Sequence, residues 1–275
     1  MLRVSEWVSL NKSSLYKLNL CLNNKIRYYT IHMTNNLRPL LTIEEIKNSC
    51  EVVVGQDGKL LELCRVSEEL KQGLETLSKY NKLITVYGSA QFSQTNKMVK
   101  LAEEMASRLV KEANAGIITG GGPGIMRAAN KGAFEAGGVS IGATIVIPTE
   151  QTTNPYVTEE VPFQYFFTRK TALRFASEMA VCFPGGFGTL DEMFDLLNLI
   201  KTGKVYHIPV ILFGSEFWNP LNNYFIEMLD NKYGTITPKD LNLFVITDSI
   251  DEVVEIAKSV ATKEVKIGLA KIGRD

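Results

Sequence analysis

The stretch VCFPGGFGTLDEMFDLL, residues 181–197, combines features that are suited to chemistry. An apolar run stops at Pro184, three glycines follow within four residues, and Thr189, Asp191 and Glu192 then open a helical pattern. Glycine costs conformational entropy, so the fold must need either special backbone angles there or close access to a ligand. Carboxylates directly beyond such a turn are suited to acid–base work on a bound group.

A structural interpretation competes for the same residues. Thr189 and Glu192 are three residues apart, which is the spacing of a capping box in which Glu192 reaches back to the backbone N–H of Thr189. Asp191 would then add favourable charge at the helix start. A capping box does not require Pro-Gly-Gly in front of it, so the glycines still indicate a ligand against the backbone.

A second glycine turn, TGGGPGIM at residues 119–126, leads into another helical pattern. Pro123 falls near the expected first turn, a favoured place for proline. The free N–H groups and dipole at such a helix start form a phosphate site. Ile125 and Arg127 occupy the places that a third glycine would need in GxGxxG, and no GKS or GKT follows. The spacing therefore disfavours a dinucleotide enzyme and a P-loop NTPase, and a tight turn with nothing bound stays open.

The third candidate element is FFTRKTALRF, residues 166–175. If Thr168 caps this helix, Arg169 and Lys170 lie in its first turn, where cations meet the positive end of the helix dipole. Glu192 or a ligand phosphate would remove that conflict. The alternative is a solvated basic pair on the surface.

The rest of the chain predicts the elements that must position these residues. Nearly apolar strands alternate with helices, and the stretch after residue 148 is predicted to be a loop. Strands are expected at 83–90, 115–119, 139–148, 181–183, 208–214 and 242–249, and helices at 95–112, 125–137, 169–180, 189–203, 217–229 and 250–260. This pattern favours a Rossmann-like, doubly wound α/β fold, with a mainly parallel sheet covered by helices on both faces. Glycines at 88, 120–124 and 185–188 would then converge at the carboxyl ends of the strands.

We expect this Rossmann-like domain to span residues 83–262, with a C-terminal tail at 263–275. Residues 33–82 form a helical preamble, in which Leu70, Leu74 and Leu77 make one apolar stripe. Residues 1–32 are rich in basic residues and are expected to be a poorly ordered or targeting-like extension.

Composition excludes several classes of function. The chain has 30 basic and 30 acidic residues, so we expect no nucleic acid and no membrane among its partners. No apolar run is long enough to span a membrane. Two histidines and four scattered cysteines without a CxxC pair disfavour a structural zinc site, and no metal is expected. The expected location is cytoplasmic, or organellar if residues 1–32 act as a transit segment.

GGGPGIM, FFTRK and PGGFGTLDE, in this order, resemble the family described as possible lysine decarboxylase, whose characterised members include the LOG-type cytokinin-activating enzymes. Those enzymes are phosphoribohydrolases of nucleoside 5′-monophosphates. The PGGxGTxxE motif is complete from Pro184 to Glu192, and the resemblance covers roughly residues 83–258. It implies hydrolysis of an N-glycosidic bond, giving free base and ribose 5-phosphate without a cofactor. A decarboxylase is disfavoured because nothing marks a pyridoxal-binding lysine.

The resemblance also implies roles for individual residues. Arg169 and Glu192 would be the catalytic pair, with Glu192 stabilising an oxocarbenium-like state and activating water. The nucleotide phosphate would be surrounded by Gly121, Gly122, Gly124, Gly185, Gly186, Gly188 and Thr189. Gly88, Ser89, Met126 and Lys170 would complete the substrate site.

The sequence departs from the LOG pattern at one place. Plant and actinobacterial members more often show Met-His-Glu before the Arg-Lys pair, whereas this chain has Phe166-Phe167-Thr168. The base that is preferred, and whether cytokinin precursors are substrates, therefore stay open. The family further implies a homodimer. Two alternatives stay open: a non-catalytic nucleotide-binding or carrier protein on the same fold, and a scaffold whose turns bind nothing.

Overall fold

The computed structural model describes residues 15–22, 25–32, 52–54, 60–146 and 152–260. The chain divides into two compact units, residues 1–50 and 51–275. In the first unit, β1 (Leu15–Leu22) and β2 (Lys25–His32) pair antiparallel. The second unit holds a short antiparallel pair, β3 (Val52–Val54) and β4 (Leu60–Glu62), and the main sheet. Residues 1–14 of the expected extension, 33–51 of the preamble and the tail at 263–275 lie outside the described residues.

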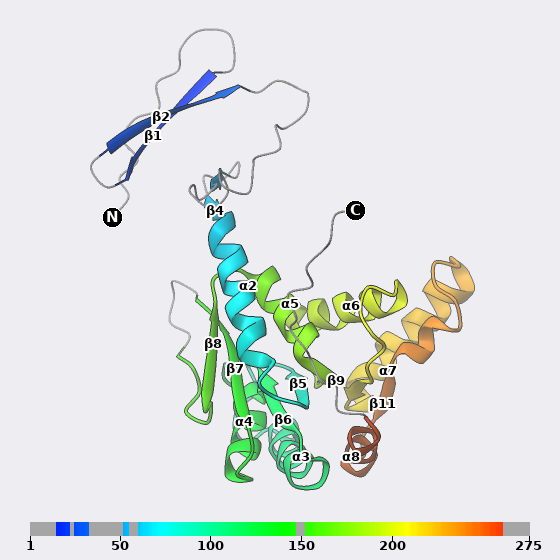
Figure 1. The fold of residues 1–275 in the computed structure, drawn as a ribbon. Helices are drawn as coiled ribbons and strands as arrows, with labels where there is room; N and C mark the ends of the chain where they lie inside the picture. The colour runs from blue at the N-terminus through cyan, green and yellow to red at the C-terminus, as the bar shows by residue number, and fades with distance from the viewer. Residues whose placement is uncertain (1–14, 23–24, 33–51, 55–59, 147–151, 261–275) are drawn as a thin grey trace, which may run out of the picture. The chain divides into compact units, whose positions relative to one another are not determined.

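The main sheet has seven strands in the order β11-β10-β9-β5-β6-β7-β8, and every neighbouring pair is parallel (Figure 1). The chain enters at the centre, runs outward to one edge, and returns beside its first strand to build the other half. The strands are β5 (Leu83–Tyr87), β6 (Gly116–Thr119), β7 (Ser140–Ile145), β8 (Glu159–Phe163), β9 (Ser177–Cys182), β10 (Val210–Phe213) and β11 (Val245–Thr247). The doubly wound, Rossmann-like class is confirmed.

Helices cover both faces of this sheet, as the apolar strands predicted. Side chains that alternate along β5 divide between the faces: Ile84 packs with α3, α4 and α8, whereas Leu83 packs with α2 and α5. The helices are α2 (Leu63–Leu77), α3 (Lys97–Ala113), α4 (Ile125–Glu135), α5 (Phe166–Ala176), α6 (Phe187–Lys201), α7 (Ser215–Tyr224) and α8 (Ile250–Ser259). A π-helix (Phe225–Lys232) continues α7, and a 3₁₀ turn (Asp240–Leu243) precedes β11.

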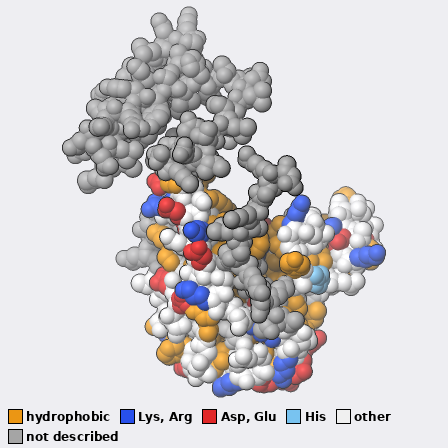
Figure 2. All heavy atoms as spheres, in the orientation of Figure 1, with side chains coloured by type: hydrophobic (Ala, Val, Ile, Leu, Met, Phe, Trp, Pro, Cys, Tyr) orange, Lys and Arg blue, Asp and Glu red, His pale blue; other side chains and the backbone are white. Residues whose placement is uncertain are grey.

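The expected helix in the preamble is present as α2. Leu77 is buried in the core, and Leu70 and Leu74 pack against it, which confirms the predicted apolar stripe. Along this helix Lys and Arg side chains lie among Asp and Glu side chains, with no gathering of one sign (Figure 2). The described surface of this helix therefore offers no strong attraction for a polyanion.

The predictions at an edge strand and at a helix end were wrong. The stretch after residue 148, predicted to be a loop, contains the edge strand β8. Only Val161 and Phe163 of this strand are buried, and Pro162 lacks an N–H, a pattern that fits an edge strand but is too short to stand out. The helix predicted over 169–180 ends at Ala176, and β9 begins at Ser177 with no glycine or proline between them. The Ser177 hydroxyl donates to the Leu173 carbonyl at 2.6 Å, which satisfies the end of the helix without a turn residue.

Candidate active site

The strand order reverses between β5 and β9, where Tyr87 lies opposite Cys182. Such a switch point is where open α/β sheets bind ligands. The loop after β5 joins the two glycine turns there: the Ser89 N–H donates to the Pro184 carbonyl at 3.1 Å, and the Ser89 carbonyl accepts from the Ile125 N–H at 3.0 Å. The expectation that the three glycine segments converge at one edge is confirmed.

The turn after β6 is held in shape by buried amides. Asn154 donates from Nδ2 to the carbonyls of Gly121 and Gly122, at 3.0 and 3.2 Å, and to Oδ1 of Asn130 at 2.9 Å. The Gly121 N–H donates to the Thr119 hydroxyl at 2.9 Å, so it fixes the turn and is not free for a ligand. Gly121 and Gly124 have φ of +73° and +64°, conformations that side chains rarely adopt.

The loop residues Gly88 and Gly124 fit tightly into this arrangement. A Cβ on Gly88 would lie 2.6 Å from Cγ2 of Ile125, and one on Gly124 would lie 2.2 Å from the Ser89 carbonyl oxygen. Met126 and Arg169 both approach Gly120, with Sδ and Nη1 lying 2.9 and 3.6 Å from the position of its ideal Cβ. Met126 therefore lies near the arginine with which it was predicted to share a site.

The glycines after β9 serve two different purposes. A Cβ on Gly185 would lie 2.1 Å from the hydroxyl of Thr189, so this glycine is needed for packing. The ideal Cβ positions of Gly186 and Gly188 meet nothing within 4 Å, and both residues are exposed. The backbone at the start of α6 is therefore open to a ligand, as a phosphate site requires.

The predicted capping box is wrong, because the helix starts earlier than its spacing suggested. α6 begins at Phe187 with Gly186 as its N-cap, and no side chain among the described residues caps it. Thr189 lies within the first turn, buried, and Glu192 lies in the second turn. Asp191 likewise falls beyond the first turn. Glu192 is therefore free of a capping role.

Glu192 is a buried acid, with 7% of its surface exposed. Burial raises its pKa from 4.5 to about 7, and the nearby Arg169 and Lys170 cations offset part of that rise. Asp191 and Asp195 raise it further. A carboxyl with a pKa near neutrality can both give and take a proton at physiological pH.

Arg169 approaches Glu192 from α5, with its Nη2 lying 3.7 Å from Oε1 of the carboxylate. The guanidinium also lies over the ring of Phe166, 5.1 Å from its centroid. Its Nε is buried and has no hydrogen-bond partner among the described residues. The prediction that Thr168 caps this helix is wrong: α5 begins at Phe166 after the N-cap Tyr165, so Arg169 and Lys170 lie past the first three residues.

Lys170 lies in a ladder of ion pairs between α5 and α6. Its ammonium lies 2.9 Å from Asp191 and 4.0 Å from Asp195, and Arg174 also pairs with Asp195. The two basic residues are four apart, as are the two acids, so one face of each helix meets the other. Lys170 is therefore held by carboxylates, which fixes the two helices in the register that brings Arg169 to Glu192.

Reasoning from sequence missed Tyr87, the last residue of β5. Burial raises the pKa of its phenol well above the usual range, and the Glu192 carboxylate raises it further, whereas Arg169 and Arg174 lower it. The phenol therefore lies within the electrostatic reach of the candidate pair. Its place in a predicted strand, directly before Gly88, was the available signal.

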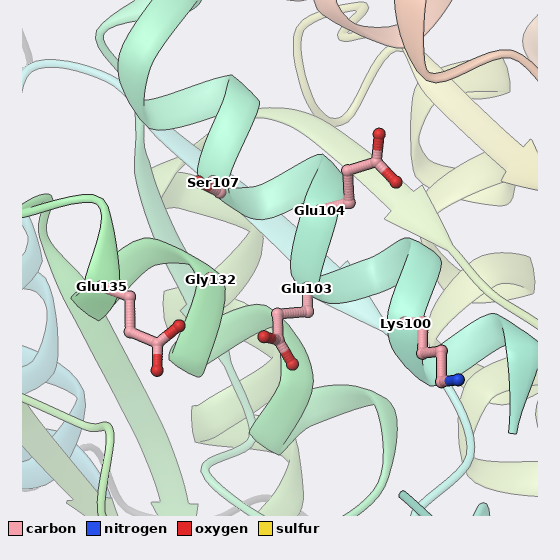
Figure 3. Close-up of a pocket in the computed structure, with 6 residues that line it drawn as sticks. All are labelled: Lys100, Glu103, Glu104, Ser107, Gly132 and Glu135. Atoms are coloured by element: carbon pink, nitrogen blue, oxygen red, sulfur yellow. The ribbon is translucent and has the colours of Figure 1, made fainter. Parts of the chain in front are cut away.

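A surface pocket lies away from these residues, between α3 and α4 (Figure 3). Gly132 lets the helices approach, since a Cβ there would lie 2.0 Å from the Glu103 carbonyl oxygen. Lys131 already pairs with Glu103 at 2.7 Å and with Glu135 at 3.8 Å. The lining of the pocket carries more acidic than basic residues, which disfavours a phosphate there; it consists of Lys100, Glu103, Glu104, Ser107, Gly132 and Glu135.

The fold and the converging turns thus define a Rossmann-like α/β protein with a candidate site at its switch point. The family model described as possible lysine decarboxylase matches residues 126–257. A probable cytokinin riboside 5′-monophosphate phosphoribohydrolase of Oryza sativa is 25% identical over 187 residues, covering 65% of this chain and 83% of that protein. A cytokinin riboside 5′-monophosphate phosphoribohydrolase of Arabidopsis thaliana is 25% identical over 207 residues, covering 72% and 92%. These matches confirm the resemblance to the LOG family.

Among solved structures, the molybdenum cofactor carrier protein of Chlamydomonas reinhardtii aligns with a TM-score of 0.48 and 22% identity, covering 66% of this chain and 98% of that one. This likeness is too weak to bear on function. Within the described residues, no helix is both long and apolar enough to cross a membrane. The same residues hold no group of three or more His, Cys, Asp or Glu side chains placed to bind a metal ion.

Proposed function

We propose that this protein hydrolyses the N-glycosidic bond of a nucleoside 5′-monophosphate, releasing the free base and ribose 5-phosphate. The observation that carries the proposal is the buried Glu192 facing Arg169 at 3.7 Å, one turn beyond the open backbone of Gly186 and Gly188. The curated relatives named above support it, since both are named for this reaction.

In the proposed complex the phosphate lies at the start of α6. The first N–H groups of a helix have no partner within the helix, and α6 has neither an acidic residue in its first turn nor a side-chain cap among the described residues. A phosphate there would be stabilised by these N–H groups and by the helix dipole. Binding at this remote group would place the ribose over the carboxyl of Glu192.

Glu192 supplies the proton chemistry in this proposal. As the bond between C1′ and the base nitrogen breaks, its electron pair leaves with the base, and positive charge develops on C1′ and the ring oxygen. An ionised Glu192 stabilises that charge and takes a proton from the attacking water, whose oxygen bonds to C1′. The departing base takes a proton, either from solvent or from Glu192 once the carboxylate has accepted the proton of the water. Since its pKa is about 7, Glu192 can both accept and return that proton at neutral pH.

Arg169 acts through its charge. It keeps part of the Glu192 population ionised despite burial. No cofactor enters this reaction, because water is the only co-substrate.

We propose that the active form is a homodimer. Exposed aromatic residues on α5 and α6 support a protein contact there, since isolated monomers seldom expose many such side chains together. They are Phe166, Phe167, Phe175, Phe187 and Phe194. Light scattering after size exclusion should give twice the chain mass of 30.6 kDa.

The test of the function is release of ribose 5-phosphate from AMP, GMP, CMP and prenylated AMP. We expect turnover of at least one, and the fastest will name the base class. Calorimetry with the same nucleotides separates the alternatives. Binding without turnover by the folded wild-type protein would point instead to a carrier, and absence of binding to a scaffold.

A further inference from the structure

Helix α2 lies against the helix that carries Arg169. It packs beside α5 and β8 (Figure 1). Gly73 makes this approach possible, because a Cβ there would lie 2.6 Å from the ring of Phe163 and 3.6 Å from the Cβ of Ala172. Glu69, one helical turn before Gly73, is thereby brought to the start of α5.

The carboxylate of Glu69 accepts three hydrogen bonds at that point. Its Oε2 accepts from the N–H of Gln164 at 2.8 Å, and its Oε1 accepts from the N–H of Tyr165 at 3.1 Å and from the Thr168 hydroxyl. The N-cap residue Tyr165 offers no side-chain cap of its own, and the first turn contains no acid. A carboxylate from a distant helix thus compensates the positive end of α5.

A short chain of bonds connects Glu69 to Arg169. Tyr165 gives its N–H to Glu69, and its carbonyl accepts the N–H of Arg169 at 3.2 Å. The Tyr165 hydroxyl in turn accepts from the N–H of Glu62, next to the start of α2. The Arg169 guanidinium lies over the ring of Phe166, a residue of the same turn, and its ion pair with Glu192 spans 3.7 Å. Its direction therefore depends on the backbone that Glu69 holds.

We propose that Glu69 is a positioning residue, which fixes the first turn of α5 so that the Arg169 guanidinium faces Glu192. This inference rests on the proposed function for its catalytic meaning, while its geometric claim is independent of turnover. Glu69 lies outside the residues that the family model matches. Helix α2 of the preamble would therefore contribute to the active site.

The test measures the pKa of Glu192, which several neighbouring charged or titratable groups influence. Those that face it are Arg169 and Lys170 on α5, Asp191 and Asp195 on its own helix, Tyr87 on β5 and Cys182 on β9. Only Arg169 and Lys170 among these are cations. A loss of Arg169 from its position will therefore raise the pKa of Glu192.

The experiment is an NMR titration of protein labelled with ¹³C at glutamate carboxyls, with the Glu192 signal assigned by its loss in Glu192→Gln. We expect Glu69→Ala to raise the pKa of Glu192, in the same direction as Arg169→Ala but by less. Combining the two should add nothing to Arg169→Ala alone, because Glu69 acts through Arg169. Glu75→Ala is the matched control: it removes an exposed carboxylate of the same helix that pairs with Lys71 at 3.8 Å, and it should leave the titration unchanged.

Glu69→Gln is the control for the case in which Glu69→Ala does not fold. Its amide oxygen can still accept from Tyr165 and Thr168, so it should give a smaller shift than Glu69→Ala. In the activity assay Glu69→Ala should lower kcat by about 10- to 100-fold with little change in KM.

A folded Glu69→Ala whose Glu192 titrates as in wild type would overturn the inference, as would equal and additive shifts in the double variant. If wild type shows no turnover while the titration shifts as expected, the proposed function fails and the positioning role stands.

Discussion

Oε1 of Glu192 lies 3.7 Å from Nη2 of Arg169, and the two side chains are only 9% and 15% exposed. At this distance the groups attract one another without sharing a hydrogen bond. Burial therefore prevails over the ion pair, and the pKa of Glu192 is raised to about 7. Glu192 lies beyond the first turn of α6, so helix capping does not explain its place.

This buried acid should make stability depend on pH. The pKa of Glu192 is higher in the folded protein, about 7, than in the unfolded chain, about 4.5, so the folded state binds the extra proton between these values. The stability that this proton provides is present below pH 4.5 and is lost as pH rises through 7, by roughly 3 kcal/mol. Glu192→Gln should remove that loss. Urea unfolding of wild type and Glu192→Gln at pH 5 and pH 8 measures how the free energy of unfolding changes with pH. The same change in both proteins would argue against a raised pKa of Glu192.

Arg169→Ala should raise the pKa of Glu192 further, because the guanidinium is the largest influence that lowers it. In a pH profile of kcat/KM, the limb that reports Glu192 should move to higher pH as the rate falls. Lys170→Ala should move the same limb less, since Lys170 is the smaller influence and is already paired with Asp191. An equal shift in both variants would show that Arg169 does not lower the pKa of Glu192 more than Lys170 does.

The glycines of the PGGFGT turn should separate folding from binding. Gly188→Ala places a methyl group in open space within a helix, so stability should hold or rise by up to about 1 kcal/mol. Nucleotide binding should weaken, because the methyl group blocks the approach of a phosphate. Gly185→Ala should instead lower stability by roughly 1–3 kcal/mol, since the new methyl group would collide with Thr189. Thermal melts and calorimetry test both, and unchanged affinity in Gly188→Ala would place the phosphate elsewhere.

Asn154→Ala should damage the other glycine turn. It removes three buried hydrogen bonds and leaves the Gly122 carbonyl without that donor. A cost of about 1–3 kcal/mol is expected, together with weaker nucleotide binding. Thr153→Ala is the control, because the hydroxyl of the neighbouring, half-buried Thr153 donates to Glu160 at 2.7 Å and not to the glycine turn. Similar losses in both would indicate a general effect on the loop.

The sequence was enough to predict the sheet, because its inner strands are mostly apolar and β5, β6 and β9 lead into glycine turns. It did not reveal β8, whose polar outer face and Pro162 resemble a loop. The roles of the site residues were harder to predict than the fold, since spacing alone does not show where a helix begins. Thr189 and Glu192 matched a capping box, yet α6 begins at Phe187. The roles of Glu69 and Asn154 could not be predicted from the sequence, because each side chain bonds to a turn that is far from it in the chain.

The most direct measurement compares wild type with Glu192→Gln for both ribose 5-phosphate release and nucleotide affinity, using the best nucleoside 5′-monophosphate of the panel. We predict turnover by wild type, a loss of at least about 100-fold in kcat for the variant, and a Kd that changes little. Equal rates in the two proteins, or binding without any turnover by wild type, would contradict this prediction.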